Sequence, residues 1–367
     1  MNPFFVSHVI IAKDEELVIE RHLRSISGAH KYWDEIVVAD TGSTDRTREL
    51  AASMGARVVE VPWTHSFSEA RNAAIAHADP RADLVVMFDA DELLGRNGHL
   101  LRGRLEADHH AGKRFFGVTL EWSYNPDGSP HYIQPKFAAF DPRMFRFEHH
   151  FHELLVGPYT FENQVKYGDI VLEHRPLRNR QGGERKAVWS RAAEREMADF
   201  PDDPRSLFYC AREFHYLGDN ARAAETYERY FRTSGDSSIY RMQARELHAK
   251  VLSALGRHDE AYRQLLLAIE HTPDRREPYM RLAEFCFARK RWIETAVWCR
   301  AALAIAPSPE LFLHQTHMAH YRDSPHDLLS IALYNLGDKE EGRRQLELAI
   351  GYRPGDARLL ANRRWFE

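Results

Sequence analysis

The stretch VVMFDADE, residues 85–92, is an apolar run that ends abruptly in Asp89, Asp91 and Glu92. A short apolar run bounded by polar residues is typical of a strand that is buried on both faces of a parallel sheet. Two carboxylates spaced as D-x-D at the end of such a strand can bind one divalent cation and leave positions for water and phosphate oxygens. The alternative is that Asp91 or Glu92 caps a helix over residues 93–106.

The residues around this stretch alternate short apolar runs with amphipathic segments. The apolar runs predict strands, and apolar residues at helical spacing predict helices between them. Strands are expected at 6–12, 35–40, 56–63 and 83–91, and helices at 15–27, 43–55 and 66–78. This order is typical of βαβ units that form a mostly parallel sheet. Short aromatic runs between about 115 and 175 indicate further strands and loops.

Length and composition narrow the class of protein. A chain of 367 residues predicts two or three domains, and 44% hydrophobic with 28% charged residues is an ordinary globular composition. The formal net charge of −4 gives no field that would draw the whole molecule to nucleic acid or to an anionic membrane. No run is long enough for a membrane span, and the first residues lack the features of a signal peptide. We therefore expect a cytoplasmic protein, in which Cys210, Cys286 and Cys299 are small buried side chains.

A repeat replaces the strand pattern beyond residue 185. Four positions each precede a helix-like segment and are followed by a small residue five positions later, by Tyr or Ala twelve later and by Gly or Pro seventeen later. These positions are Gly218, Gly256, Lys290 and Gly337, followed by Ala223, Ala261, Thr295 and Gly342, by Tyr230, Ala268, Ala302 and Ala349, and by Gly235, Pro273, Pro307 and Pro354. The interval from Gly256 to Lys290 is that of a tetratricopeptide (TPR) repeat, so we expect stacked helical hairpins; the alternative is unrelated amphipathic helices.

Polar residues cluster directly after the predicted strands. The first strand is followed by Lys13, Asp14, Glu15 and Glu16, and the second ends in Asp40, Thr41, Gly42, Ser43, Thr44 and Asp45. In an open α/β sheet, ligands bind outside the carboxyl ends of the strands. Acids gathered at that edge repel one another unless cations or hydrogen-bond donors lie among them. We therefore expect a ligand site at this edge of the sheet.

Two features of this edge have more than one interpretation. Asp40 precedes Thr-Gly-Ser, which suits an acceptor for a base or a ribose hydroxyl next to a turn that glycine opens to a ligand. The alternative is an Asx-turn, in which the carboxylate accepts hydrogen bonds from its own loop. Arg71 and Asn72 lie on the helix before the D-x-D strand. They would reach a phosphate or order the D-x-D loop, or else form an exposed helix face.

Together, the four motifs resemble those of the family 2 glycosyltransferases of GT-A fold, and they occur in the same order. The motifs are IIAKDEE (10–16), VVADTGSTDRT (37–47), SEARNAAIAHA (68–78) and VVMFDADE (85–92). The resemblance implies an α/β fold, a GT-A (Rossmann-like) nucleotide-sugar domain with a mostly parallel sheet, followed here by an all-α, TPR-like repeat domain. We place the two domains at residues 1–180 and 181–367.

The resemblance also implies roles for individual residues. The residues expected to bind the donor, a UDP-sugar, are Ala12, Lys13, Glu15, Asp40, Asp45, Arg71 and Asp89. Among them, Asp40 would contact the uracil or ribose, and Asp89 the ribose or diphosphate side. Asp91 would bind a divalent metal, Mn²⁺ or Mg²⁺, which neutralises the leaving diphosphate.

An inverting enzyme also needs a carboxylate that removes the acceptor's proton on the face of the sugar opposite the leaving group. Many family members carry this base in an E-D pair that the present sequence lacks. In FRFEHHFHELL (145–155), His152-Glu153 resembles instead the HE motif of the subset with TPR-like helices, which includes peptide S-glucosyltransferases. Glu153 is therefore the predicted base, with His152 and His174 as further metal or diphosphate ligands. The alternative is that Glu153 pairs with a nearby arginine.

The leading expectation is a metal-dependent, inverting transfer of a hexose, glucose, to a peptide or protein, with the repeats binding the acceptor or a second copy of the chain. A second hypothesis makes modified DNA bases the acceptor. It draws on the basic segment 175–186 and the aromatic run 121–125, and the acidic net charge opposes it. A third hypothesis is an inactive scaffold whose repeats bind a partner protein.

Overall fold

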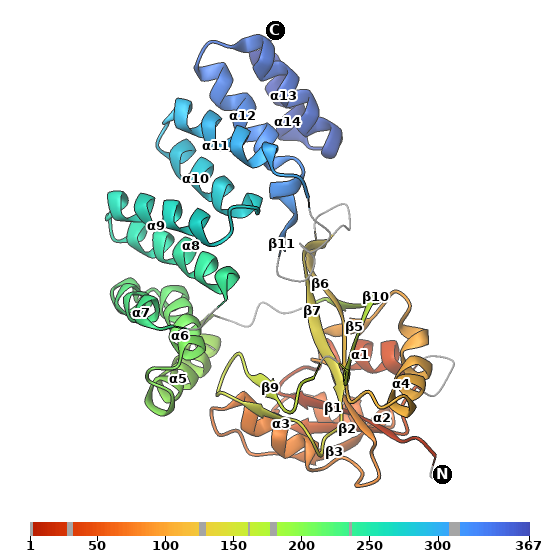
Figure 1. Ribbon diagram of the computed structural model, residues 1–367. Coiled ribbons are helices and arrows are strands. Elements are labelled where there is room, and N and C mark those ends of the chain that lie inside the picture. The colour runs from red at the N-terminus through yellow and green to blue at the C-terminus, as the bar shows by residue number, and fades with distance from the viewer. Residues whose placement is uncertain are drawn as a thin grey trace. The chain divides into compact units, whose positions relative to one another are not determined.

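The computed structural model describes residues 3–27, 32–124, 130–160, 162–176, 182–234, 237–307 and 316–367 (Figure 1). Its contacts define two compact units, of which the first ends at Asp199 and the second begins at Phe200. Helix α5 (Gly182–Asp199) therefore goes with the first unit. The expected domain boundary after residue 180 stays a prediction.

The first unit is built around a mostly parallel sheet with the strand order β3-β2-β1-β4-β7-β6-β10-β5. Its strands are β1 (Val6–Ala12), β2 (Glu35–Asp40), β3 (Arg57–Glu60), β4 (Leu84–Met87), β5 (Glu92–Leu94), β6 (Phe115–Tyr124), β7 (Pro130–Phe140) and β10 (Gln164–His174). Strands β1 to β4 pair in parallel, whereas β7 runs antiparallel to both β4 and β6. The predicted α/β class and the four predicted strands are confirmed.

Helices and a small hairpin cover the two faces of this sheet (Figure 1). The elements are α1 (Ile19–Ser27), α2 (Thr47–Ser53), α3 (Phe67–Ile75), η1 (Gly98–Leu100), α4 (Leu101–His110), β8 (Arg146–Glu148) and β9 (Leu154–Val156). Apolar residues of α1, α2 and α4 form one core cluster with the sheet, and those of α3 and β9 form another. Strands β1, β2 and β4 are buried because they lie between these layers, while the edge strand β3 is partly exposed.

The D-x-D stretch does not begin a helix. Glu92 is the first residue of β5, which pairs with β10, and α4 starts only at Leu101. The helix-capping alternative for Asp91 and Glu92 is therefore wrong. Asp91 lies instead in the turn that leads from β4 to β5, and Glu92 begins β5.

The second unit consists of helical hairpins that follow one another along the chain (Figure 1). Its elements are α6 (Pro204–Leu217), α7 (Asn220–Arg232), α8 (Ser238–Ala254), α9 (His258–His271), α10 (Arg276–Ala288), α11 (Trp292–Ala304), β11 (Thr316–His317), η3 (Met318–Tyr321), α12 (Ser324–Asn335), α13 (Lys339–Tyr352), α14 (Ala357–Asn362) and η4 (Arg363–Trp365). All three cysteines are buried, as predicted. Within the described ranges, no helix has the length and hydropathy to cross a membrane.

The residue type that recurs between the helices of each hairpin is explained by its backbone conformation. Gly218, Gly256, Lys290 and Gly337 have φ angles of 91°, 76°, 57° and 88°, and each follows the first helix of a hairpin. A residue in this left-handed region ends a helix, and glycine adopts it without the steric cost of a Cβ. The small residues that follow these positions by five in the repeat are buried, so the two helices of a hairpin can approach closely. Gly235, another position of the repeat, lies outside the described residues.

Gly342 on α13 tests this close packing. An added Cβ would lie 2.7 Å from Phe366 Cε1 and 3.2 Å from the carbonyl oxygen of Ser330. We expect Gly342→Ala to lower the free energy of unfolding by about 1–3 kcal/mol, because overpacking displaces backbone. Gly351 on the same helix has no atom within 4 Å of its Cβ position. Gly351→Ala should be neutral or stabilising in the same urea titration, and equal stability of both variants would contradict the packing.

Candidate active site

The site lies at the carboxyl edge of the parallel strands. The chain runs outward from β1 to β2 and β3 and then returns to place β4 on the other side of β1. Such a reversal opens a crevice beyond the strand ends, where ligands bind in open α/β sheets. Ala12 and Asp40 are the paired last residues of β1 and β2, and Asp89 follows the end of β4 at Met87.

The loops after β1 and β2 are held together by hydrogen bonds. The N–H groups of Asp14 and Glu15 donate to the hydroxyls of Ser43 (2.9 Å) and Thr47 (2.7 Å). The N–H of Glu16 donates to Asp45 Oδ2 (3.1 Å), and the other oxygen of Asp45 accepts from the N–H of Thr47 (2.9 Å). Asp45 therefore fixes the shape of this edge from within, and the side chains of Lys13 and Glu15 remain partly exposed beside it.

Asp40 forms the Asx-turn that was the alternative to a ligand contact. Its carboxylate accepts hydrogen bonds from the N–H groups of Gly42 (3.2 Å) and Ser43 (3.1 Å). Only 1% of its side chain is exposed. Gly42, with a φ of 102°, makes the turn, so the backbone rather than the Asp40 carboxylate faces outward here. The predicted contact of Asp40 with uracil or ribose stays a prediction.

Arg71 on α3 joins two of the predicted site residues. Its Nη2 donates to Asp89 Oδ1 (2.7 Å), and its Nε donates to Glu153, the residue before β9. Only 12% of the Arg71 side chain is exposed. Burial opposes its charge, but the two carboxylates outweigh burial and raise the pKa of Arg71. The exposed-face alternative for Arg71 is therefore wrong. Glu153 does pair with an arginine, which was the alternative to its role as the base, and that role stays a prediction.

Lys136 on β7 is a site residue that the sequence motifs did not reveal. Its Nζ lies 2.9 Å from Asp89 Oδ2 and 2.5 and 2.6 Å from the two oxygens of Glu92. Burial favours the neutral form of Asp89, but Lys136 and Arg71 outweigh it and hold the pKa of Asp89 well below its usual range. Burial also raises the pKa of Glu92, against the pull of Lys136.

Asp91 and His174 form the outer part of the site. His174 Nε2 lies 3.2 Å from Asp91 Oδ2, and about a third of each side chain is exposed. The hydrogen bond to Asp91 raises the pKa of His174, against the effect of burial. A carboxylate oxygen and an imidazole nitrogen are both ligands that divalent cations take, so Asp91 and His174 could hold a cation in place of their mutual hydrogen bond.

The other two predicted metal ligands are engaged elsewhere. Both oxygens of Asp89 accept hydrogen bonds from Arg71 or Lys136, and the ring of His152 packs against Trp189 at 5.1 Å. Within the described part of the chain, no three His, Cys, Asp or Glu side chains form a group that could hold a metal. The structure thus brings Asp91 and His174 together but not the four predicted ligands.

Two buried histidines pack behind the D-x-D turn, and one of them contacts its backbone. His22 on α1 lies with its Nδ1 2.6 Å from the carbonyl oxygen of Glu92, and its Nε2 lies 3.2 Å from Nε2 of His8 on β1. Burial lowers the pKa of His22 to about 4 and that of His8 well below its usual value. His22 is therefore neutral and donates from Nδ1 to Glu92. A polar residue inside the apolar run of β1 was the signal for this pair.

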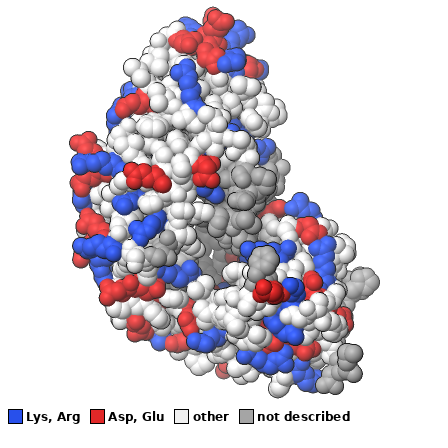
Figure 2. Space-filling model, in the orientation of Figure 1, with Lys and Arg blue, Asp and Glu red and all other residues white. Residues whose placement is uncertain are grey.

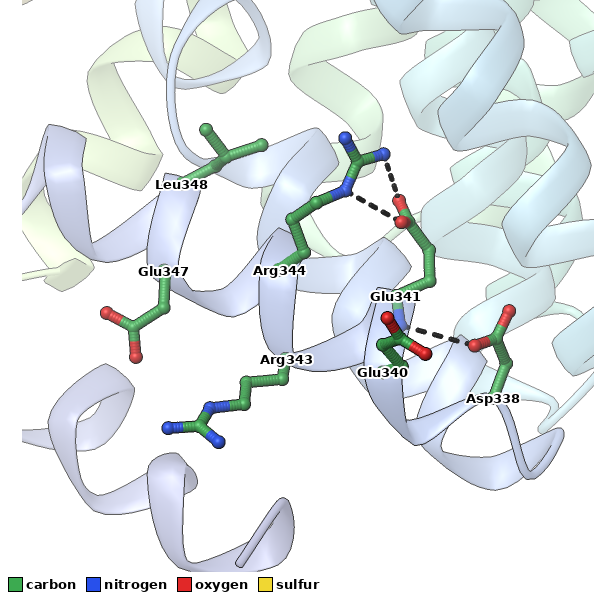
Figure 3. A pocket seen from close by; sticks show the side chains of 7 residues that line it. All are labelled: Asp338, Glu340, Glu341, Arg343, Arg344, Glu347 and Leu348. Atoms are coloured by element: carbon green, nitrogen blue, oxygen red, sulfur yellow. Dashed lines mark hydrogen bonds and ion pairs between the residues drawn. The ribbon is translucent and has the colours of Figure 1, made fainter.

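The helical unit carries a shallow hollow of another kind (Figure 3). It is lined by Asp338, Glu340, Glu341, Arg343, Arg344, Glu347 and Leu348. Arg344 pairs with Glu341, and Arg363 pairs with Glu347. Charges of both signs are interspersed over the visible face of the helices (Figure 2), so this hollow is a solvated, self-paired surface.

A family model and two curated proteins are similar to parts of this chain. Residues 7–151 match the family model described as glycosyl transferase family 2. An uncharacterized glycosyltransferase of Rickettsia prowazekii is 33% identical over 149 residues, covering 37% of this chain and 48% of that protein. A TPR repeat-containing protein of Synechococcus elongatus is 42% identical over 89 residues, covering 24% of this chain and 21% of that protein. Residues 7–151 are therefore similar to the family 2 glycosyltransferases, and TPR-like helices follow them.

A solved structure of lower similarity is glucosyl-3-phosphoglycerate synthase from Mycobacterium tuberculosis in complex with Mn²⁺, UDP and glucosyl-3-phosphoglycerate. It is 20% identical, with a TM-score of 0.35, and the match covers 53% of this chain and 80% of that chain. The present chain spans between a fifth and about half of the length of the two curated relatives.

Proposed function

We propose that this protein is a metal-dependent, inverting glycosyltransferase that moves a hexose, glucose, from a UDP-sugar to a peptide or protein acceptor. The observation that carries the proposal is the position of Arg71, which hydrogen-bonds both Asp89 of the D-x-D turn and Glu153 of the HE motif. Two motifs far apart in the sequence thus meet at one guanidinium. A donor-binding carboxylate and a base need this proximity to act on one sugar.

The proposed roles follow from the chemistry of each group. Glu153 would accept the proton of the acceptor nucleophile as it attacks the anomeric carbon and the bond to the diphosphate breaks. Arg71 and Lys136 order the carboxylates with which they pair, at the edge where the leaving diphosphate would lie. A divalent cation held by Asp91 and His174 would add to that neutralisation when bound. Ala12, Lys13, Glu15, Asp40 and Asp45 would form the nucleotide side of the pocket.

The helical unit supports the proposal of a peptide or protein acceptor. Stacked hairpins of this kind offer an extended surface on which a peptide or protein can lie, or a second copy of the chain. The DNA-base hypothesis rests on segments 175–186 and 121–125, in which residues 177–181 and 125 lie outside the described residues. The scaffold hypothesis is disfavoured by the pairing of Asp91 with His174 and of Arg71 with Glu153. A cytoplasmic location stays a prediction.

Asp91→Ala tests the metal and the donor together. We expect UDP-glucose with Mn²⁺ to raise the melting temperature of the unaltered protein, since a ligand that binds the folded state stabilises it. In Asp91→Ala this Mn²⁺-dependent shift should disappear, and sugar transfer or donor hydrolysis should fall about 100-fold, because a bound cation supplies several kcal/mol of charge stabilisation. Glu106→Ala, at an exposed carboxylate on α4, is the matched control. No shift with any nucleotide sugar in the unaltered protein would favour the scaffold hypothesis.

A further inference from the structure

The loop that carries Glu153 has two residues in the left-handed backbone conformation. It spans residues 149–153 and joins β8 to β9. The strand pair next to the loop is Glu148 with Leu154. His149 and His152 have φ angles of 69° and 47°. Side chains with a Cβ adopt this left-handed region at a cost of roughly 1–2 kcal/mol each, so surrounding contacts must hold them there. These contacts fix the backbone that carries Glu153, and the hydrogen bond from Arg71 holds its side chain.

Glu196 on α5 supplies two of these contacts. One carboxylate oxygen accepts a hydrogen bond from His149 Nδ1 (2.6 Å), and the other accepts from the backbone N–H of His150 (2.7 Å). Only 1% of Glu196 is exposed. A buried carboxylate is costly unless it is hydrogen-bonded, and here both oxygens are used on the loop. Glu196 therefore acts as a two-point anchor for the residues that precede Glu153.

His150 extends the anchor to both neighbouring helices. Its Nε2 donates to Asp199 Oδ2 at the end of α5 (2.8 Å), and a hydrogen bond of 3.0 Å joins its Nδ1 to Ser66 Oγ. The backbone N–H of Phe67, the first residue of α3, donates to the carbonyl oxygen of His150 (2.8 Å). Because α3 also carries Arg71, the partner of Glu153, one helix positions both ends of the loop.

An aromatic contact completes the hold of α5 on this loop. The ring of Trp189 lies 6.0 Å from that of Phe151, at 89°, and 5.1 Å from that of His152. Phe151 is 1% exposed, so this contact excludes water from the inner side of the loop. Helix α5 thus contacts the loop through the backbone N–H of His150, the side chains of His149 and His150, and the rings of Phe151 and His152.

We propose that Glu196 is a positioning residue for the base Glu153, so that α5 is part of the catalytic machinery of the transferase domain. This inference rests on the proposed function. Without the anchor, His149 would leave its left-handed conformation, His150 would lose its backbone hydrogen bond, and the Glu153 carboxylate would lose its fixed place opposite the donor. Misplacing a catalytic group by about 1 Å can lower a rate by about 100-fold.

Three variants of the full-length chain test the proposal. Glu196→Gln keeps the size of the side chain but cannot accept at both positions. Asp199→Asn removes the negative charge beside His150 Nε2 but keeps an oxygen that can accept its hydrogen bond, at a side chain that is 52% exposed. Glu194→Gln, at an exposed position on the same helix, is the control. Two readouts are used: steady-state kinetics with UDP-glucose and acceptor, and hydrogen exchange of the backbone amides of residues 149–156.

We expect Glu196→Gln to lower kcat about 10- to 100-fold while KM for UDP-glucose stays within about twofold, since the donor contacts are intact. Amides of residues 149–156 should exchange about tenfold faster or more, while those of β1 and β4 are unchanged. Asp199→Asn should show smaller changes in the same direction. Glu194→Gln should behave like the unaltered protein in both readouts.

The outcomes separate this inference from the proposed function. If the unaltered protein transfers no sugar, the proposed function fails, while the exchange data still show whether Glu196 orders the loop. If the unaltered protein is active and Glu196→Gln matches Glu194→Gln in kcat, the positioning role is overturned. Unchanged exchange of residues 149–156 in Glu196→Gln would overturn it as well. A raised KM with unchanged kcat would assign Glu196 to donor binding instead and would also overturn it.

Discussion

Glu153→Gln is expected to lower the rate of sugar transfer about 1,000-fold while leaving the affinity for UDP-glucose within about twofold, because a positioned base contributes between about 100- and 10,000-fold. The amide oxygen of Gln can still accept the hydrogen bond from Arg71 Nε, so the geometry of the loop is retained. What the variant loses is a carboxylate that takes up the acceptor's proton. Single-turnover transfer and a separate donor-binding titration measure the two effects.

The matched control is Glu148→Gln on the same hairpin. Glu148 pairs with Arg146 at the surface, and 38% of its side chain is exposed. The control should retain full transfer. If Glu153 serves only as a partner of Arg71, Glu153→Gln will turn over at the rate of this control, and the assignment of Glu153 as the base is then excluded.

Lys136→Met is expected to lower the free energy of unfolding of the transferase domain by about 3–5 kcal/mol, the usual cost of breaking a buried ion pair by removing one partner. The ammonium group lies between Asp89 and Glu92, and Glu92 is 2% exposed. Burial opposes the charge of Lys136, but the two carboxylates outweigh burial and raise its pKa. Without Lys136, two neighbouring carboxylates of like charge lose the cation between them.

A second substitution separates lost charge balance from lost packing. In Lys136→Met/Glu92→Gln the excess negative charge is reduced by one, so part of the lost stability should return. Urea unfolding followed by circular dichroism measures all three proteins. A loss of less than about 1 kcal/mol in the single variant would place the interaction among weak surface pairs and contradict its burial.

The order of strands and helices in the first unit could be predicted from the sequence. Periodicity of apolar residues is a local property, and it marked β1, β2 and β4 within a few residues. The strand ends and the D-x-D turn followed from the same pattern. The hairpins of the second unit were also predicted, because a left-handed residue such as Gly256 recurs at the end of the first helix.

Part of the site was predicted through motifs and part was not. The motifs singled out Asp89, Asp91, Arg71 and Glu153, and the structure pairs Arg71 with two of them. The motifs gave no indication of Lys136, because a lone lysine in an aromatic strand has no pattern of its own. Its role arises from pairing: Val85 faces Phe140 and Val86 faces Ala139, and continuing this antiparallel register brings position 136 opposite position 89.

The sequence by itself determined which segments become strands, where the polar strand ends lie and how the helical repeats are spaced, since each depends on neighbours within a few turns of chain. Only the tertiary structure decided that β7 pairs with β4, that Lys136 neutralises Asp89 and Glu92, and that Glu196 of α5 holds the loop of Glu153. The hydrogen bonds of Lys136 and Glu196 join residues 44 to 47 positions apart, and the strand pairing joins residues 53 to 55 apart. They depend on strand order, register and helix placement, which local periodicity does not encode.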